Sequence, residues 1–188
     1  MSAVKKIILI NLVVYGITFL FFLNGLYLNN ILALYPIFSD NFSPYQLITH
    51  IFSHSTPLHL FSNMILLLIF STKIEEKLSD KQSWNFYLLS GLLSSGVYCL
   101  FSESPIIGAS GCVFAFMGFY LINNPISNLR SYSGISKAFA SCFIIFSFIT
   151  ELWDSIFTTD DIAHLCHVFG FCFGIFYALR NKSKFVQP

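Results

Sequence analysis

Charge is scarce in this chain. Only 10% of its 188 residues are Asp, Glu, Lys or Arg, whereas 55% are hydrophobic, and the mean hydropathy is +0.71. Soluble globular domains carry about 25% charged residues. This scarcity excludes an ordinary soluble domain, and the length leaves little chain for a separate soluble module. We predict an all-α, polytopic membrane protein with a single domain over residues 1–188.

A disulfide framework is also missing. The cysteines are odd in number, and their spacing does not match a stapled secreted fold. All five lie inside apolar segments: Cys99, Cys112, Cys142, Cys166 and Cys172. We interpret them as small apolar packing residues.

Six apolar segments have lengths near those that spanning helices need. They cover approximately residues 7–23, 57–72, 84–101, 107–122, 135–150 and 162–179. The first segment ends in Phe21-Phe22-Leu23-Asn24 without a small-residue cleavage site. It therefore predicts an uncleaved first span rather than a secretory signal.

Basic residues are absent from one face of this predicted topology. With six spans, all ten Lys and Arg residues fall at the termini or in the second-to-third and fourth-to-fifth connections. The opposite face holds Asp40, Glu103, Glu151, Asp154, Asp160 and Asp161. Any other number of spans would scatter the basic residues over both faces. The positive-inside rule then predicts that both termini are cytoplasmic, and we expect a bilayer, not a nucleic acid, as the partner.

The fourth segment carries a serine among small residues, in Gly108-Ala109-Ser110-Gly111. About 16 residues barely cross a hydrocarbon core of roughly 30 Å, so we expect Ser110 to lie below the outer surface. Backbone that is not helical is tolerated at that depth only beside protein or a water-filled cavity. A hydrolase needs such a cavity.

The sixth segment offers a base for this serine. Small residues at helical spacing form one stripe in each segment: Gly111, Ala115 and Gly118 in the fourth, and Gly170 and Gly174, following His167, in the sixth. Such stripes let membrane helices approach closely. Glycines alone would indicate packing without chemistry, but here Ser110 and His167 lie near the same end. Serine needs an adjacent base, and no acidic residue lies at depth in the sixth segment, so we predict a Ser110–His167 dyad.

The second segment begins with two polar residues, His59 and Asn63, four positions apart on one helical face. Both can donate hydrogen bonds, as an oxyanion requires. The alternative role is hydrogen bonding between helices. The backbone N–H of Ser110, at a helix start beside Gly108, is a further candidate donor. We expect His50 and His54, upstream, to brace the loop.

Together these residues resemble the rhomboid family of intramembrane serine proteases, over roughly Tyr45 to Leu179. The resemblance rests on His59 with Asn63, on Gly108-Ala109-Ser110-Gly111, and on His167 with Gly170 and Gly174. It implies a six-helix bundle, Ser110 as nucleophile, His167 as base, and an oxyanion site near His59, Asn63, Gly108 and Gly111. It also implies transmembrane protein substrates, a prokaryotic inner membrane, and no metal or cofactor.

Some positions depart from the family pattern or leave an alternative open. His164 is a rival base, because a catalytic histidine in this family often follows an alanine such as Ala163. However, His164 lacks the two glycines that follow His167. Tyr45-Gln46 stands where many members carry Trp-Arg, which we expect to affect loop anchoring.

Two other functions are weighed against proteolysis. A catalytically silent member of the family would bind membrane clients, but the serine and histidine are both intact. A haem- or metal-binding membrane protein would pair His59 with His164 or His167 on facing spans. That alternative leaves the other motif elements without a role.

Overall fold

The computed structural model describes residues 1–124, 132–158 and 163–182, and most of these residues are helical. In chain order its helices are α1 (Ala3–Leu23), α2 (Leu28–Leu32), α3 (Gln46–Thr49), the 3₁₀ helix η1 (His50–Phe52), α4 (Pro57–Phe70), α5 (Thr72–Lys77), α6 (Asp80–Phe101), α7 (Ser110–Asn123), α8 (Tyr132–Phe157) and α9 (His164–Arg180). An isolated bridge joins Leu34 to Ile106. Arg130, Asp160, Asp161 and Lys184, used in the charge pattern, lie outside the described residues.

Each of the six apolar segments contains one long helix, with one clear difference in its bounds. The fifth segment was predicted to end at residue 150, with Glu151 and Asp154 in a loop, but α8 continues to Phe157. No Gly or Pro interrupts the chain from Ser136 to Phe157, and the added turns carry further apolar residues. The prediction that Glu151 lies in a loop is therefore wrong.

Length and composition separate these helices into two groups. Within the described residues, three stretches are long and apolar enough to cross a membrane by themselves: Ala3–Leu23, Pro57–Lys77 and Ser136–Phe157. α7 and α9 are apolar but shorter, and the 22 residues of α6 include buried Ser83, Ser90, Ser94 and Ser95. The protein is thus a polytopic, all-helical membrane protein, and the crossing of all six helices stays a prediction.

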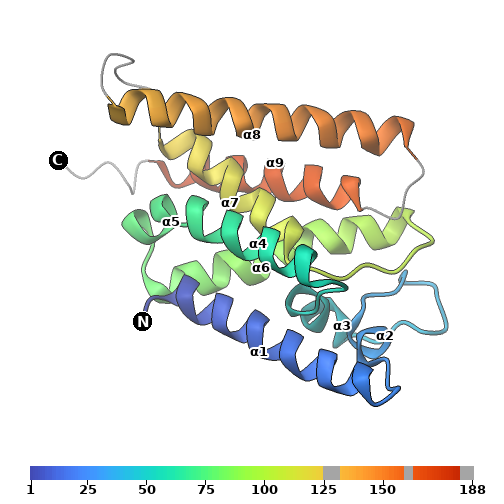
Figure 1. The fold of residues 1–188 in the computed structure, drawn as a ribbon. Coiled ribbons are helices and arrows are strands. Elements are labelled where there is room, and N and C mark those ends of the chain that lie inside the picture. The colour runs from blue at the N-terminus through green and yellow to red at the C-terminus, as the bar shows by residue number, and fades with distance from the viewer. Residues whose placement is uncertain (125–131, 159–162, 183–188) are drawn as a thin grey trace.

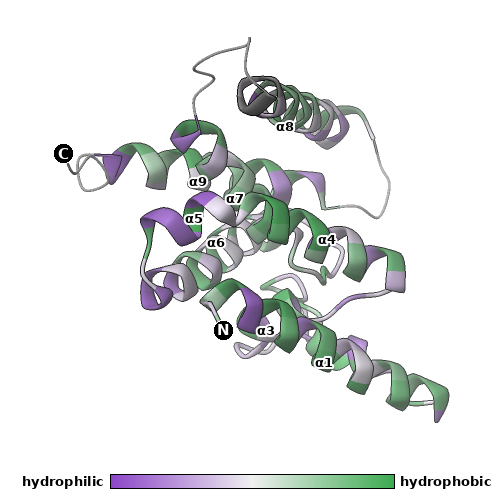
Figure 2. Ribbon diagram, turned by 60° about the vertical axis from the view of Figure 1, so that its left-hand side comes forward, coloured by the Kyte–Doolittle hydropathy of each residue, from purple (hydrophilic) through white to green (hydrophobic). Residues whose placement is uncertain are grey.

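α7 forms the centre of the bundle. Its residues from Gly111 to Phe119 are all buried, and α4, α6, α8 and α9 all contact it. Figure 1 shows α1 and α8 on opposite outer sides of the stack. These outer helices expose large apolar side chains, such as Leu20 and Phe146, and hydrophobic residues cover much of their length in Figure 2. Apolar residues on this outside are expected for a protein surrounded by lipid.

The small-residue stripes of α7 and α9 face each other at very short range. A Cβ added at Gly170 would lie 2.1 Å from the carbonyl oxygen of Gly111, and one at Gly174 would lie 2.0 Å from that of Ala115. A Cβ at Gly118 would lie 2.4 Å from the carbonyl oxygen of Phe171. All three contacts are with backbone, which cannot rotate away. Only glycine therefore permits this approach, which brings the first turn of α9 to the start of α7.

We expect Gly174→Ala to destabilise the protein by at least about 1–3 kcal/mol, the usual cost of overpacking. The new methyl group must push α7 and α9 apart, which outweighs the gain of about 1 kcal/mol in helix propensity. Gly96→Ala in α6 is the matched control, because nothing lies within 4 Å of its added Cβ. Thermal unfolding in detergent should show a lower midpoint for Gly174→Ala alone. Equal midpoints would contradict the close packing.

The connection between α1 and α4 is folded and held by side-chain hydrogen bonds. The buried Gln46 side chain accepts from the backbone N–H of Ser43 at 3.0 Å and donates to the carbonyl of Asn41 at 3.0 Å. His50 is buried too, and its Nδ1 lies 2.7 Å from the carbonyl oxygen of Gln46. Its own carbonyl accepts from the N–H of Gly108 at 2.9 Å. The Gln46 side chain therefore holds this loop together, and His50 joins it to the segment before Ser110.

Burial keeps two histidines of this connection neutral. It lowers the pKa of His50 to about 4, against a smaller opposing effect of its hydrogen bond to Gln46. It also lowers the pKa of His54 to about 3, with a further contribution from the neighbouring His59. Both values lie below the ordinary histidine pKa of about 6.5.

These depressed pKa values predict a pH-dependent stability. Between about pH 6.5 and 4 the unfolded chain binds protons at both histidines while the folded chain does not, so the free energy of unfolding falls as the pH falls. Their contribution is complete above about pH 6.5 and lost on passing below the folded pKa values. Unfolding midpoints in detergent at about pH 7 and about pH 5 should show this decline, and His50→Gln should reduce it. If the unfolding midpoint fell equally between these pH values in the unmodified protein and in His50→Gln, the prediction would be contradicted.

Candidate active site

Ser110 is the first residue of α7, and the backbone just before it explains its position. Gly108 has φ of +125°, a conformation that residues with a Cβ rarely adopt. The chain therefore turns at Gly108 and enters α7 through Ala109. This places the Ser110 hydroxyl at the N-terminus of α7. The backbone N–H of Ser110 belongs to the first turn of the helix, where no intrahelical acceptor exists.

His167 is the histidine that contacts this serine. Its Nε2 lies 2.7 Å from Ser110 Oγ, within range for a nucleophile and its base. The ring stacks on Phe114, with centroids 4.7 Å apart and planes at 8°. Phe114 follows Ser110 by four residues and therefore shares its helical face. One turn of α7 thus supplies both the serine and the ring that supports the histidine.

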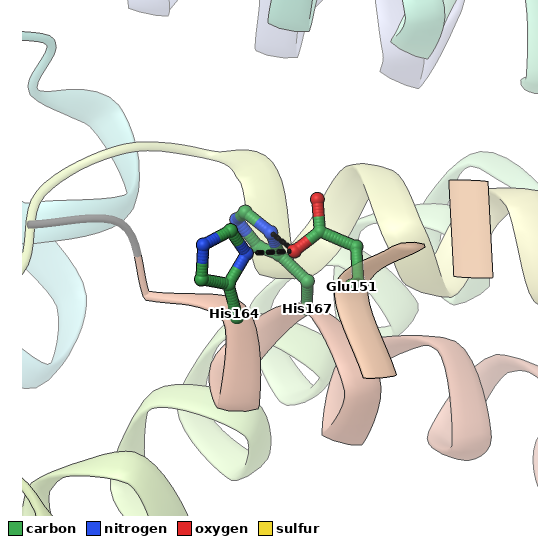
Figure 3. A group of neighbouring side chains, drawn as sticks. All are labelled: Glu151, His164 and His167. Carbon is green, nitrogen blue, oxygen red and sulfur yellow. Dashed lines mark hydrogen bonds and ion pairs between the residues drawn. The ribbon is translucent and has the colours of Figure 1, made fainter. Parts of the chain in front are cut away.

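A carboxylate lies on the other side of the histidine ring. Oε2 of Glu151, from α8, is 2.7 Å from Nδ1 of His167 and 2.6 Å from Nδ1 of His164. Figure 3 shows both rings directed at this one oxygen. The side chains of Glu151, His164 and His167 are 17%, 8% and 10% exposed. Ser110, His167 and Glu151 therefore form a continuous chain of polar contacts, where a dyad without an acid was predicted.

His59 and Asn63 lie across the same space. They line a cavity of about 690 Å³ together with Ser110, Glu151 and His167. Nδ1 of His59 is 3.1 Å from Ser55 Oγ, and its Nε2 would lie 2.6 Å from a Cβ added at Gly108. Nδ2 of Asn63 is buried and has no hydrogen-bond partner among the described residues. A buried donor without a partner costs free energy unless something in the cavity accepts from it.

Taken together, the site has the parts of an acyl-transfer enzyme. It holds a hydroxyl against an imidazole, an imidazole against a carboxylate, and an unpaired amide donor facing a cavity. Sequence reasoning brought together Ser110, His167, His59 and Asn63, but it missed Glu151 and Phe114. The spacing of four between Ser110 and Phe114 could have indicated the second. Glu151, His164 and His167 could also hold a metal ion, since one ligand atom of each lies within 4.8 Å of the others.

Comparison with known proteins finds a matching family model and several relatives. A family model described as the Rhomboid domain matches residues 41–182. The chain is 29% identical to RHOMBOID-like protein 5 of Arabidopsis thaliana over 151 residues, covering 77% of this chain and 47% of that protein. It is 27% identical over 146 residues to the rhomboid protease GlpG of Yersinia pestis (strain Pestoides F), covering 74% and 50%. The chain thus spans about half the length of the curated relatives it matches.

Proposed function

Because the chain belongs to the rhomboid family, we propose that it is an intramembrane serine endopeptidase. It would hydrolyse peptide bonds in, or just outside, the transmembrane segments of other membrane proteins. The observation that carries this proposal is the 2.7 Å contact between Ser110 Oγ and His167 Nε2 on two closely packed helices. The match to this chain covers half of the Yersinia pestis relative, which is named a rhomboid protease. That name supports the same conclusion.

The proposed first step is attack by Ser110 on the substrate carbonyl. Glu151 accepts a hydrogen bond from the Nδ1–H of His167, so the lone pair of Nε2 faces Ser110. As the Oγ–C bond forms, the serine proton passes to Nε2, and the carbonyl oxygen becomes an oxyanion. The C–N bond then breaks, and Nε2 returns the proton to the leaving amine. A water molecule repeats the sequence on the acyl-enzyme, which releases the acid product and restores the serine.

The oxyanion would lie against donors of α4 and α7. We assign this role to the unpartnered Nδ2 of Asn63 and to the backbone N–H of Ser110 at the start of α7. If the Ser55 hydroxyl donates to Nδ1 of His59, Nδ1 is the acceptor of the neutral ring. The single N–H proton of that ring is then on Nε2, on the side of Gly108. His59 then becomes a third donor. Gly108 leaves room for it, since a Cβ at that position would meet the imidazole.

We expect Asn63→Ala to lower kcat by about 10²–10³-fold with little change in KM, as loss of one oxyanion donor does elsewhere. The fold should persist, because the lost amide nitrogen makes no hydrogen bond with any described residue. Steady-state cleavage of a reconstituted substrate provides the measurement. A large rise in KM at constant kcat would instead indicate a role in substrate binding.

The orientation in the membrane follows from charge. One end of the bundle holds the starts of α1 and α6, the short helix α5 and the end of α9 (Figure 1). These segments carry the basic residues Lys5, Lys81, Lys73 and Arg180. Ser110 and His167 lie at the opposite ends of α7 and α9. By the positive-inside rule the basic end, with both termini, is cytoplasmic. The active site then opens toward the outer side of what we propose is a prokaryotic inner membrane crossed by six helices.

The proposal is tested with a defined substrate in liposomes. An α-helical backbone hides its carbonyl groups, so a transmembrane segment with a helix-breaking or small-residue stretch near its outer end should be cut. A matched segment of uninterrupted leucine and alanine should resist. Mass spectrometry of the products locates the cut. Purified, folded protein that binds such segments but never cleaves them would favour the client-binding alternative.

A further inference from the structure

Glu151, His164 and His167 converge more tightly than catalysis by Ser110 requires. A carboxylate that only orients His167 needs one hydrogen bond, to Nδ1 of that ring. Here the same oxygen also contacts Nδ1 of His164, at 2.6 Å (Figure 3). His164 begins α9, one turn before His167, so both rings project from one helical face. The second histidine therefore calls for a separate explanation.

The three side chains provide a set of ligands suited to a transition metal ion. Two imidazole nitrogens and one carboxylate oxygen form the ligand set of many zinc sites that keep an open fourth position. One ligand atom from each residue lies within 4.8 Å of the others. Zinc binds such atoms at about 2.0–2.2 Å, so a short retreat of the carboxylate would let an ion occupy the point where both rings now aim.

The cluster is also accessible and has a suitable charge. Glu151 and His167 line the cavity that holds Ser110, which gives an ion a route from the outer side. Two neutral imidazoles and an ionised carboxylate carry one negative charge, which attracts a divalent cation and leaves the loaded site with one positive charge. Ligand identity, ligand number and an entry path are among the features that a predicted metal site has to show.

We propose that Glu151, His164 and His167 form a regulatory site for a divalent transition metal ion, with zinc as the best match, and that binding of the ion inactivates the protein. The inactivation rests on the proposed function, whereas the metal site does not. An ion on Nδ1 of His167 takes the lone pair of that nitrogen, so the single ring proton of the neutral imidazole must sit on Nε2. Nε2 then donates to Ser110 and cannot accept its proton.

Metal binding is measured without reference to proteolysis. Ser110→Ala protein, purified without a histidine tag, is titrated with Co²⁺, whose visible d–d absorption reports coordination by protein ligands. Cys142 and Cys172, the exposed cysteines, are replaced by serine to remove competing thiols. Adding His164→Ala should weaken binding by at least about tenfold, since even residues outside the ligand sphere commonly contribute that much.

Inactivation is measured on protein that retains Ser110 and lacks the same two cysteines. Zn²⁺ should stop cleavage of the liposome substrate, and a chelator should restore it. The His164→Ala variant, compared with its own rate in chelator, should need at least about tenfold more Zn²⁺ for half-inhibition.

The two measurements separate the possible outcomes. Co²⁺ absorption that depends on His164, together with reversible inhibition by Zn²⁺, would support the whole proposal. No Co²⁺ absorption in folded Ser110→Ala protein would overturn the metal site, whatever the protease activity. Metal binding without inhibition would overturn the regulatory role. Metal binding by a protein that never cleaves in chelator would support the metal site and reject the proposed function.

Discussion

Replacing Ser110 with alanine is expected to reduce cleavage of a transmembrane substrate by at least about 10⁴-fold, to the background of the assay. The hydroxyl is the nucleophile of the proposed reaction, and it lies 2.7 Å from His167 Nε2. Removing a nucleophile from a site whose parts act as a unit abolishes nearly all of the rate, even when the remaining parts are intact. Initial rates in liposomes at saturating substrate provide the measurement.

Ser62→Ala is the matched control for this substitution. Ser62 lines the same cavity, but its hydroxyl donates to the carbonyl of His59 within α4. Its loss should change the rate by less than about tenfold, because the hydroxyl already has a local partner. Both variants should unfold near the midpoint of the unmodified protein. Cleavage that persists in Ser110→Ala would remove Ser110 from the role of nucleophile.

The second large effect is expected at His167. His167→Ala should lower kcat by about 10⁴-fold or more, because no described group replaces the base next to Ser110. His164→Ala should keep the rate within about tenfold of the unmodified protein, because a general base must lie within hydrogen-bond reach of the proton that it takes. In the structure His167 meets this condition at 2.7 Å, and His164 directs its Nδ1 at Glu151 instead.

The pair of histidine variants separates the two candidate bases directly. Both rings come from the first turns of α9 and both contact the same carboxylate, so nonspecific damage to the helix should affect the two variants alike. Cleavage rates and circular dichroism are measured on each. A large loss in His164→Ala with activity kept in His167→Ala would move the base one turn toward the outer surface.

Much of the site followed from local patterns in the sequence. The small-residue stripes, including the glycines after His167, indicated a close helix pair, and the structure has it. Such features depend on residues a few positions apart, where helical periodicity is reliable. The positions of the six long helices were accessible for the same reason, since apolar runs mark them.

Glu151 could not be predicted in the same way. Its role depends on how far α8 extends and on how α8 packs against α9, and a sequence pattern gives neither. An acidic residue at the end of an apolar segment is also typical of the start of a polar loop, so the pattern favoured a loop at Glu151. In the structure α8 continues through Glu151 to Phe157, and the Glu151 side chain contacts the histidines of α9. Contacts between distant segments decide such cases, and they have no signature in one sequence.

Covalent labelling tests whether the fold activates Ser110. Purified protein in detergent is treated with a serine-directed fluorophosphonate, and the modified peptide is identified by mass spectrometry. One adduct is expected, on Ser110; it should not form on protein denatured before treatment or on His167→Ala, but it should form on His164→Ala. No adduct on well-folded protein, or an adduct on another serine that survives Ser110→Ala, would contradict this expectation.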